Sequence, residues 1–207
     1  MTARKILKWP NRQLFEKSRP VDEFGQEEKE LFNDLYDTVR VNYGAGLAAP
    51  QIGFLRRVCI ISSAYVPSLP KDPSYEGFVI LTNPELTPLG EEKFAWKEAC
   101  LSIDDFTAFV KRHKNLRVKY QNSLGEEKEV TVSSEESATI QHETDHLEGK
   151  LFIHRLEGFA KTSALNKLKK RLRIKKKEAK QKESAKIGKP KRERKKKKKS
   201  FGRKKKK

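Results

Sequence analysis

The sequence is poor in the features that mark several protein classes. It holds only two cysteines, Cys59 and Cys100, among 207 residues, too few for a disulfide framework in a chain of this length. It contains no run of 18 apolar residues, so we expect no membrane-spanning helix. The first twenty residues lack the apolar core of a secretory signal. We therefore expect a cytoplasmic protein, in which a reduced thiol can serve as a metal ligand or a nucleophile.

Basic residues are concentrated at one end of the chain. The formal net charge is +19, and residues 161–207 hold 26 of the 47 Lys and Arg but three of the 28 Asp and Glu. The preceding residues are therefore mildly acidic. A lysine-rich segment of low complexity cannot bury a hydrophobic core. The composition predicts a catalytic domain over residues 1–160, a basic C-terminal helix over 161–180 and a disordered Lys-rich tail over 181–207.

The pattern of apolar residues predicts an α+β fold. Residues 26–42 and 159–180 place apolar side chains on one helical face. A Ser-x-x-Glu capping box at Ser133 predicts a helix through residue 148, with Gly149 as its C-terminal cap. Helices on either side of a block of strands are typical of an α+β protein. The expected strands lie at 57–62, at 79–89 with a break at Asn83-Pro84, at 106–112, and at 116–121, where a hairpin begins.

The helix that follows Ser133 carries a metal-binding pattern. His142 and His146 are four residues apart in His-Glu-Thr-Asp-His, so both imidazoles face the same side of a helix and can bind one metal ion. Glu143 follows the first histidine and can approach a water molecule beside that ion. A catalytic site usually has three protein ligands and an open position. Two histidines on a solvent-facing helix are the plain alternative.

Several residues are candidates for the third ligand. Cys100 lies upstream, and its thiolate suits a divalent metal of borderline softness. Cys59 stands in an apolar run and is better explained as a small buried core residue. Downstream, His154 or Glu157 would indicate another HExxH metallopeptidase, although the position of His154 does not match the H-E-x-x-H-x-x-G-x-x-H spacing. Replacing Cys100 by serine would separate these alternatives.

Three segments resemble the signature motifs of the peptide deformylases: GAGLAAPQIG (44–53), EACLS (98–102) and QHETDHLEG (141–149). Their order and spacing match the family, and the resemblance covers roughly residues 1–160. One departure is Ala99, where the family commonly has glycine; the methyl group would reshape the pocket slightly without removing a ligand. The resemblance implies antiparallel or mixed β-sheets around a central metal-binding HExxH helix, with an N-terminal helix and a basic C-terminal helix.

The resemblance also implies an activity. The family removes the N-formyl group from the formyl-methionine of nascent polypeptides and releases formate. Its motifs assign one divalent metal ion to Cys100, His142 and His146, and proton transfer to Glu143. The ion is usually Fe(II) in this family, while zinc, nickel or cobalt can occupy the site in purified samples. The metal would lower the pKa of a water molecule, which then attacks the formyl carbon.

The first two motifs supply the residues that would contact the substrate. By resemblance, the Gln51 side-chain amide and the Leu101 backbone N–H donate to the formyl oxygen as it gains negative charge. Gly46 would let its backbone pair with the first peptide group of the substrate, because no side chain blocks the approach. The substrate-binding residues implied by the motif are Gly44, Ala45 and Gly46.

The basic C-terminal end predicts a polyanionic partner. Some deformylases dock on the ribosome through their C-terminal helix, and a polybasic segment would bind rRNA by counterion release, with a steep salt dependence. A generic solubilising tail is the alternative. A different hypothesis is a ribosome- or RNA-binding protein with a vestigial hydrolase domain. The complete set of ligands together with Glu143 argues against it.

Overall fold

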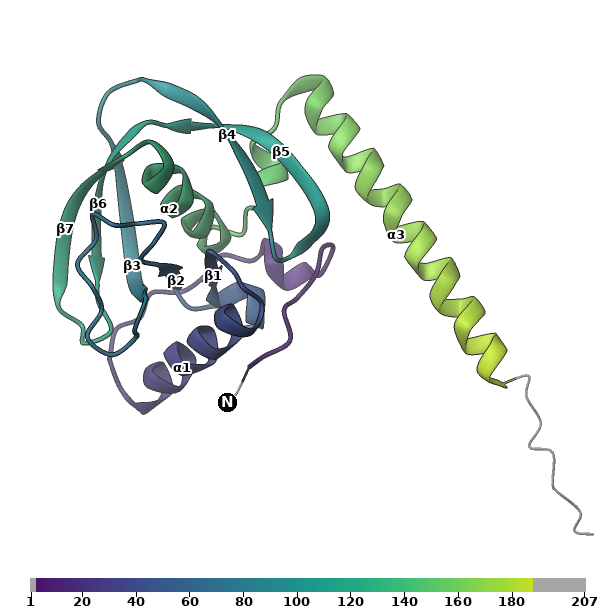
Figure 1. Cartoon of the computed structure of the whole chain (residues 1–207), viewed down its shortest axis with the longest axis horizontal. Coiled ribbons are helices and arrows are strands. Elements are labelled where there is room, and N and C mark those ends of the chain that lie inside the picture. The colour runs from purple at the N-terminus through teal and green to yellow at the C-terminus, as the bar shows by residue number, and fades with distance from the viewer. Residues whose placement is uncertain (1–2, 188–207) are drawn as a thin grey trace, which may run out of the picture. The chain divides into compact units, whose positions relative to one another are not determined.

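The described part of the chain divides into two compact units, with the division between Thr162 and Ser163. The computed structural model describes residues 3–187, and the fold is α+β (Figure 1). The elements in chain order are η1 (Arg12–Phe15), α1 (Gln26–Val41), β1 (Gly46–Ala48), η2 (Ala49–Ile52), β2 (Val58–Ser62), β3 (Phe78–Pro88), β4 (Lys93–Cys100), β5 (Ile103–His113), β6 (Asn115–Gln121), β7 (Glu127–Ser133), α2 (Ser134–Leu147), η3 (Phe152–Arg155) and α3 (Gly158–Ile187).

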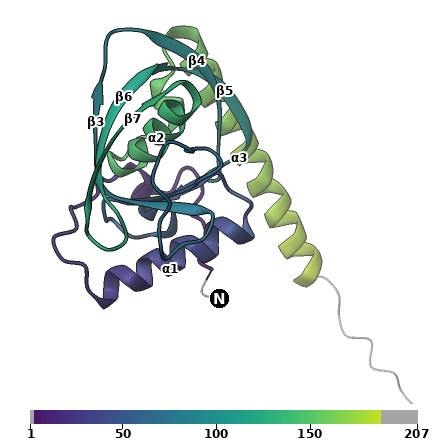
Figure 2. The same ribbon diagram turned by 60° about the vertical axis from the view of Figure 1, so that its left-hand side comes forward.

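A five-stranded sheet, in the order β1-β2-β3-β6-β7, forms the scaffold of the first unit, and its neighbouring strands are antiparallel. Because side chains alternate along a strand, the two faces bury different residues. One face carries Leu47, Ile60 and Ile80, which pack with α1. The opposite face packs with α2 through Ala48, Cys59, Ile61, Val79 and Leu81. The alternation thus builds three layers, with α1 and α2 on opposite faces of the sheet (Figure 2).

Strands β4 and β5 form a separate two-stranded antiparallel sheet. In both views, α2 lies between this hairpin and the five-stranded sheet (Figures 1 and 2). The register shifts between Glu98 and Cys100 at the end of the hairpin, and such a bulge re-aims the side chains beside it. The sequence pattern did not predict β4, and β5 begins at Ile103 rather than at residue 106. Hydrogen bonding between the two strands of the hairpin makes β4 a strand and lengthens β5 beyond the predicted range.

The helix α2 begins and ends close to the predicted residues. Ser133 is its N-cap residue, but the capping box was wrong because the Ser133 side chain makes no cap hydrogen bond. Glu136 instead accepts hydrogen bonds from the Ser68 backbone N (2.7 Å) and Oγ (2.9 Å). Gly149 has a φ of +66°, and a Cβ there would lie 2.5 Å from the Phe15 carbonyl oxygen. Glu148 is the C-cap residue, and glycine directly after it is required twice, by conformation and by space.

The predicted break at Asn83-Pro84 is a bulge within the continuous strand β3. The register shifts between Thr82 and Glu85, and Asn83 has a φ of +50°. Its side chain accepts a hydrogen bond from the Val21 N–H (2.9 Å) and donates to the Val21 carbonyl oxygen (2.8 Å). Asparagine tolerates the left-handed conformation, so the strand bends here without ending.

The helix α3 starts where the sequence predicted, but it continues past residue 180 to Ile187. The predicted boundary at 181 was therefore wrong. Residues 181–187 are mostly Gln, Lys, Glu and Ala, which are strong helix formers, so charge alone does not end the helix. The rest of the predicted tail, residues 188–207, lies outside the described residues. Within residues 3–187, no helix offers the apolar length needed to cross a bilayer.

Candidate metal centre and active site

Three potential metal ligands meet beside α2. Cys100 lies at the end of β4, while His142 and His146 project from α2. The Cys100 Sγ is 3.3 Å from the His146 Nε2, and one ligand atom from each of the three residues lies within 4.8 Å of the others. In a tetrahedral site with bonds of about 2.3 Å to sulfur and about 2.0 Å to nitrogen, these atoms lie roughly 3.5 Å apart. Donor types and spacing therefore fit one divalent metal ion.

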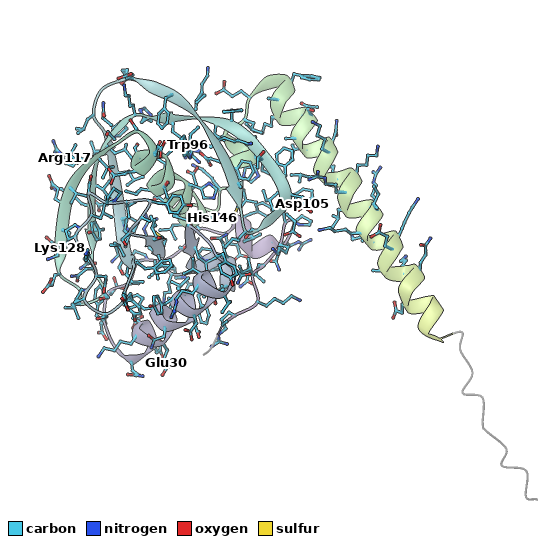
Figure 3. All side chains as sticks on the ribbon, in the orientation of Figure 1. Glu30, Trp96, Asp105, Arg117, Lys128 and His146 are labelled. Atoms are coloured by element: carbon cyan, nitrogen blue, oxygen red, sulfur yellow. The ribbon has the colours of Figure 1, made fainter. Side chains whose placement is uncertain are left out.

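Buried charges around the three residues favour a thiolate. Burial raises the pKa of the Cys100 thiol, but the positive charges and hydrogen bonds of His146 and His142 outweigh it, so the pKa lies well below its usual value. Burial lowers the pKa of His142, but hydrogen bonds with Cys100 and Glu98 raise it well above its usual value. The thiolate is the form of cysteine that binds metal. Figure 3 shows His146 in the interior of the first unit, whereas Glu30, Arg117 and Lys128 lie at its periphery.

A buried carboxylate orients one of the two histidines. The Oε2 of Glu98 lies 2.6 Å from the Nδ1 of His142, which leaves Nε2 of His142 for a metal. Arg112 donates two hydrogen bonds to Glu98, at 2.6 and 2.9 Å. Burial raises the pKa of Glu98, but the hydrogen bonds with Arg112 and His142 outweigh this effect, so the pKa lies below its usual value and Glu98 stays ionised. By contrast, the buried Nδ1 of His146 has no hydrogen-bond partner within residues 3–187.

Charged residues behind Glu98 continue this network. Arg112 also donates from Nη1 to the Oδ2 of Asp145, at 2.7 Å. The same Oδ2 accepts from the Nε of Arg155 at 3.0 Å, and the Nη2 of Arg155 donates to Oδ1. Burial raises the pKa of Asp145, but Arg155 and Arg112 together hold it below its usual range. Each buried charge in the network therefore faces a charge of opposite sign.

Glu143 lies beside the three potential ligands and is 5% exposed. Burial raises its pKa, while the charges of His142 and His146 oppose that shift. Its Oε2 has no hydrogen-bond partner among the described residues, so this oxygen is available to a bound water molecule. A Cβ at Gly46 would lie 2.6 Å from Oε1 of Glu143. The glycine in the first motif is therefore needed by the Glu143 side chain itself, a constraint that the sequence did not reveal.

The amide of Gln51 has a fixed direction. Its Oε1 accepts a hydrogen bond from the Ala48 N–H at 2.8 Å. This leaves Nε2 facing the site, 3.1 Å from the Ser102 Oγ and 3.5 Å from the Cys100 Sγ. A side-chain amide held through its oxygen presents its N–H groups as donors. Gln51 can therefore donate to a substrate oxygen beside Cys100.

A cavity of about 750 Å³ opens over these groups. Trp96, Tyr43 and Tyr65 contribute aromatic surface to its wall, and Ala99 also lines it. The predicted site residues in its wall are Gly44, Ala45, Gly46, Gln51, Cys100, Leu101, His142 and Glu143. The remaining predicted residue, His146, is 1% exposed. The fold thus brings all the predicted residues to one place.

The rival ligands lie elsewhere. Cys59 is fully buried in the core packed with α2, and burial raises the pKa of its thiol. The Nδ1 of His154 accepts a hydrogen bond from the Leu151 N–H at 3.0 Å, which caps η3. Neither residue joins the group of potential ligands within residues 3–187. The arrangement therefore gives no support to a downstream third ligand.

Sequence reasoning missed Glu98, Arg112 and Asp145 as parts of the site. Glu98 carried a weak signal, because it stands in the second motif, EACLS, two residues before Cys100. Arg112 carried none, because it stands in the basic stretch KRHKN yet is 2% exposed. Only the pairing of β4 with β5 brings it to Glu98. Asp145 lies within the motif, but its partners Arg112 and Arg155 come from two other elements, β5 and η3.

Comparisons with known proteins agree with this geometry. The polypeptide deformylase family profile matches residues 3–162. The peptide deformylase of Campylobacter jejuni is 38% identical over 165 residues, which cover 80% of this chain and 92% of that protein. A crystal structure of a peptide deformylase from Legionella pneumophila is 31% identical, has a TM-score of 0.70, and covers 84% of this chain and 97% of its own.

A second solved structure, the peptide deformylase of Ehrlichia chaffeensis in complex with actinonin, is 29% identical with a TM-score of 0.71. The match covers 83% of this chain and 98% of that one. Members of this family use a single metal ion to remove the N-formyl group from nascent polypeptides. The family profile, the relatives and the shared fold together show that this chain belongs to the polypeptide deformylase family.

Proposed function

We propose that Cys100, His142 and His146 hold the single metal ion with which this chain hydrolyses the formyl group of formyl-methionine. The observation that carries the proposal is the convergence of one thiol and two imidazoles within 4.8 Å, with Glu143 beside them in an open cavity. When bound, a divalent ion lowers the pKa of water and polarises a carbonyl group. The donor set of one sulfur and two nitrogens suits such an ion.

Glu143 acts as the proton carrier in this proposal. Its oxygen Oε2 accepts the proton of the attacking water, and the same carboxyl group then donates a proton to the leaving amine nitrogen. Three features support the assignment: the free oxygen, the burial of the side chain, and its place one residue after His142. The pKa of Glu143 is raised by burial, which makes its protonated form easier to reach in the second step.

The formyl oxygen is stabilised by hydrogen-bond donors on the cavity wall. We assign this role to Nε2 of Gln51, 3.5 Å from the Cys100 Sγ, and to the backbone N–H of Leu101, the residue that follows Cys100; both residues line the cavity. Donors that are already aligned stabilise the negative charge as it develops. The substrate backbone would pair with β1, because this strand lies at the edge of its sheet in the described part of the chain. Gly44, Ala45 and Gly46 would make these contacts.

The identity of the metal is a separate part of the proposal. We assign Fe(II) to the working enzyme on the basis of family resemblance. A site with one thiolate and two imidazoles also binds zinc, nickel or cobalt, and the intrinsic affinity order places Zn²⁺ above Fe²⁺. We therefore expect samples purified in air to carry mixed metals, with turnover restored when Fe(II) is added under nitrogen to the apoenzyme.

The decisive assay measures formate released from formyl-Met-Ala-Ser by the purified full-length chain. We expect turnover that a chelator abolishes and that a divalent metal restores. Glu143→Gln is the matched control, because it keeps the ligands and removes the proton carrier. Metal-independent release, or full turnover by Glu143→Gln, would refute the proposed site. Turnover of an unformylated peptide bond instead would favour another metallopeptidase.

We also propose that the basic C-terminal end binds rRNA, so that the enzyme works beside the exit of nascent chains in the cytoplasm. The support is the charge of residues 161–207, with 26 basic and three acidic residues. Such a segment binds nucleic acid largely through phosphate contacts and counterion release. Residues 1–160 would form the catalytic domain, and the residues beyond them the binding segment.

Deleting residues 188–207 tests this second proposal and keeps every described residue of α3. We expect unchanged turnover of formyl-Met-Ala-Ser and weaker co-sedimentation with ribosomes at low salt. A control chain replaces the same residues by a Gly-Ser segment of equal length. Equal ribosome binding by all three proteins, or binding that does not weaken as salt rises, would contradict the rRNA contact.

A further inference from the structure

We propose that Arg155 is a positioning residue of the metal site, which acts on His142 through Asp145, Arg112 and Glu98. The inference rests on the proposed metal-binding role of His142. It concerns a residue outside the three motifs, in the turn η3 (Phe152–Arg155). Arg155 touches none of the three potential ligands; its effect is carried by a continuous row of hydrogen-bonded charges.

The row alternates in sign from the surface to the ligand. The guanidinium of Arg155 donates to both oxygens of Asp145. Asp145 accepts from Arg112 at 2.7 Å, and Arg112 binds Glu98 through two nitrogens. Glu98 then meets the Nδ1 of His142 at 2.6 Å. Each link is a charge-assisted hydrogen bond, the strongest kind in proteins.

Burial makes these links depend on each other. The side chains of Arg112 and Glu98 are 2% and 3% exposed, and that of Asp145 is 6% exposed. Buried charges must stay paired, because the protein interior solvates them poorly. Without Arg155, Asp145 would be left with Arg112 as its partner in this row, and its vacated oxygen Oδ1 would compete with Glu98 for the N–H groups of Arg112. A rotation of the rigid guanidinium fork toward Asp145 would weaken its two bonds to Glu98, and Glu98 would hold the His142 ring less firmly.

The turn η3 supports the same histidine by a second route. The ring of Phe152 stacks on His142, with ring centres 6.0 Å apart and an angle of 29° between the planes. Phe152 also stacks with Phe106, at 6.1 Å and 24°. Arg155 fastens η3 to Asp145 on α2, so it keeps Phe152 against His142. The side chain of Arg155 is 44% exposed, so replacing it leaves no large internal cavity.

Arg155 and Arg57 form a matched pair for substitution, which separates an effect on His142 from a general loss of stability. Arg57 donates to Glu148 at the C-terminal end of α2, the same end that Arg155 clamps through Asp145. Among the described residues, Glu148 pairs with Arg57 and Lys17, and no hydrogen bond or ion pair continues from it to Glu98. Loss of either arginine removes an ion pair from α2, but only the loss of Arg155 breaks the row that leads to His142.

The experiment compares Arg155→Met, Arg155→Lys and Arg57→Met with the natural chain, all at full length. Each apoprotein is titrated with Co²⁺, and the ligand-field and sulfur-to-cobalt absorption bands report affinity and geometry. Residues that orient a metal-binding histidine typically change affinity by 10–100-fold, so we expect Arg155→Met to bind Co²⁺ about tenfold more weakly, with shifted bands. Arg155→Lys should recover part of the loss. Arg57→Met should melt at a lower temperature but bind Co²⁺ normally.

The outcomes distinguish this inference from the proposed function beneath it. A natural chain that fails to bind Co²⁺ with a sulfur-to-cobalt band would refute the proposed metal site. Normal binding by the natural chain, with unchanged affinity and bands in Arg155→Met, would overturn only the role of Arg155. Equal weakening in Arg57→Met would also overturn it, because the effect would then follow stability. If Arg155→Met does not fold, Arg155→Lys against Arg57→Lys makes the same comparison.

Discussion

The two walls of the candidate active-site cavity differ in chemistry. The wall built by β4 and β5 carries Cys100 and Glu98, with Arg112 bound to Glu98 behind it, so it offers a potential ligand and charges. The wall built by β1 and η2 carries Gly46 and Gln51, which supply close backbone approach and an amide donor. A buried charge needs a partner of opposite sign, and the hairpin provides one by bringing Arg112 on β5 to Glu98 on β4. The neutral wall needs no such partner and is part of the main sheet. The difference predicts that damage to the charged wall removes metal, while damage to the neutral wall spares metal and slows turnover.

The largest effect is expected from Cys100→Ala. The substitution removes one of the three proposed ligands, so metal content should fall sharply and turnover should drop to the level of the chelated enzyme. Metal analysis by plasma mass spectrometry and formate release measure both. Cys59→Ala is the matched control, because this cysteine is fully buried in the core; it should lower the melting temperature but keep metal. Full metal content in Cys100→Ala would contradict the prediction that damage to the charged wall removes metal.

Gln51→Leu tests the neutral wall. Loss of one oxyanion donor costs about 10²–10³-fold in kcat, and we expect that loss with normal metal content. The fixed amide orientation, through the Ala48 N–H, explains why leucine of similar size cannot substitute. Gln13→Leu, which removes a part-buried amide elsewhere, should have no effect on kcat. A change in KM alone would show that Gln51 binds substrate without stabilising the transition state.

Gly46→Ala should have a smaller effect on the same wall. The new Cβ would lie within 3.0 Å of three atoms of Glu143, so the carboxyl group must move. A misplacement of about 1 Å can cost about 100-fold in rate, and we expect up to that loss with metal retained. Gly25→Ala adds a Cβ with only an ordinary contact, 3.7 Å from Glu28, and should leave turnover intact. Loss of metal in Gly46→Ala would contradict the division of roles.

The smallest effect concerns His154, outside both walls. Burial and the charge of Lys161 lower its pKa in the folded state, whereas the unfolded value is about 6.5. Below that value the unfolded chain binds a proton that the folded chain resists, so the free energy of unfolding falls as pH decreases. Above it the contribution is complete. His154→Asn, whose oxygen can still accept from the Leu151 N–H, should flatten this part of the urea-unfolding profile and leave turnover at neutral pH unchanged.

The elements with local signals were predicted well. α1 has a clear helical period and a glycine stop, and the ends of α2 follow from Ser133 and Gly149. Strand β4 was missed because three charged residues interrupt its pattern, and its strand geometry depends on pairing with β5. The capping box at Ser133 was wrong because Glu136 finds a tertiary partner in Ser68. The local sequence pattern cannot show whether the Glu136 carboxylate accepts from the N-cap backbone or from a residue distant in the sequence.

The sequence by itself determined which donor groups the candidate metal site holds. The spacing of His142 and His146 follows from the helical repeat, and the three motifs name the residues around them. Only the tertiary structure decided how those residues are held. The row from Arg155 to Glu98 joins four elements, and Gly46 meets Glu143 across nearly a hundred residues. Such contacts arise because burial forces charges to pair and side chains to fit, wherever the fold brings them together.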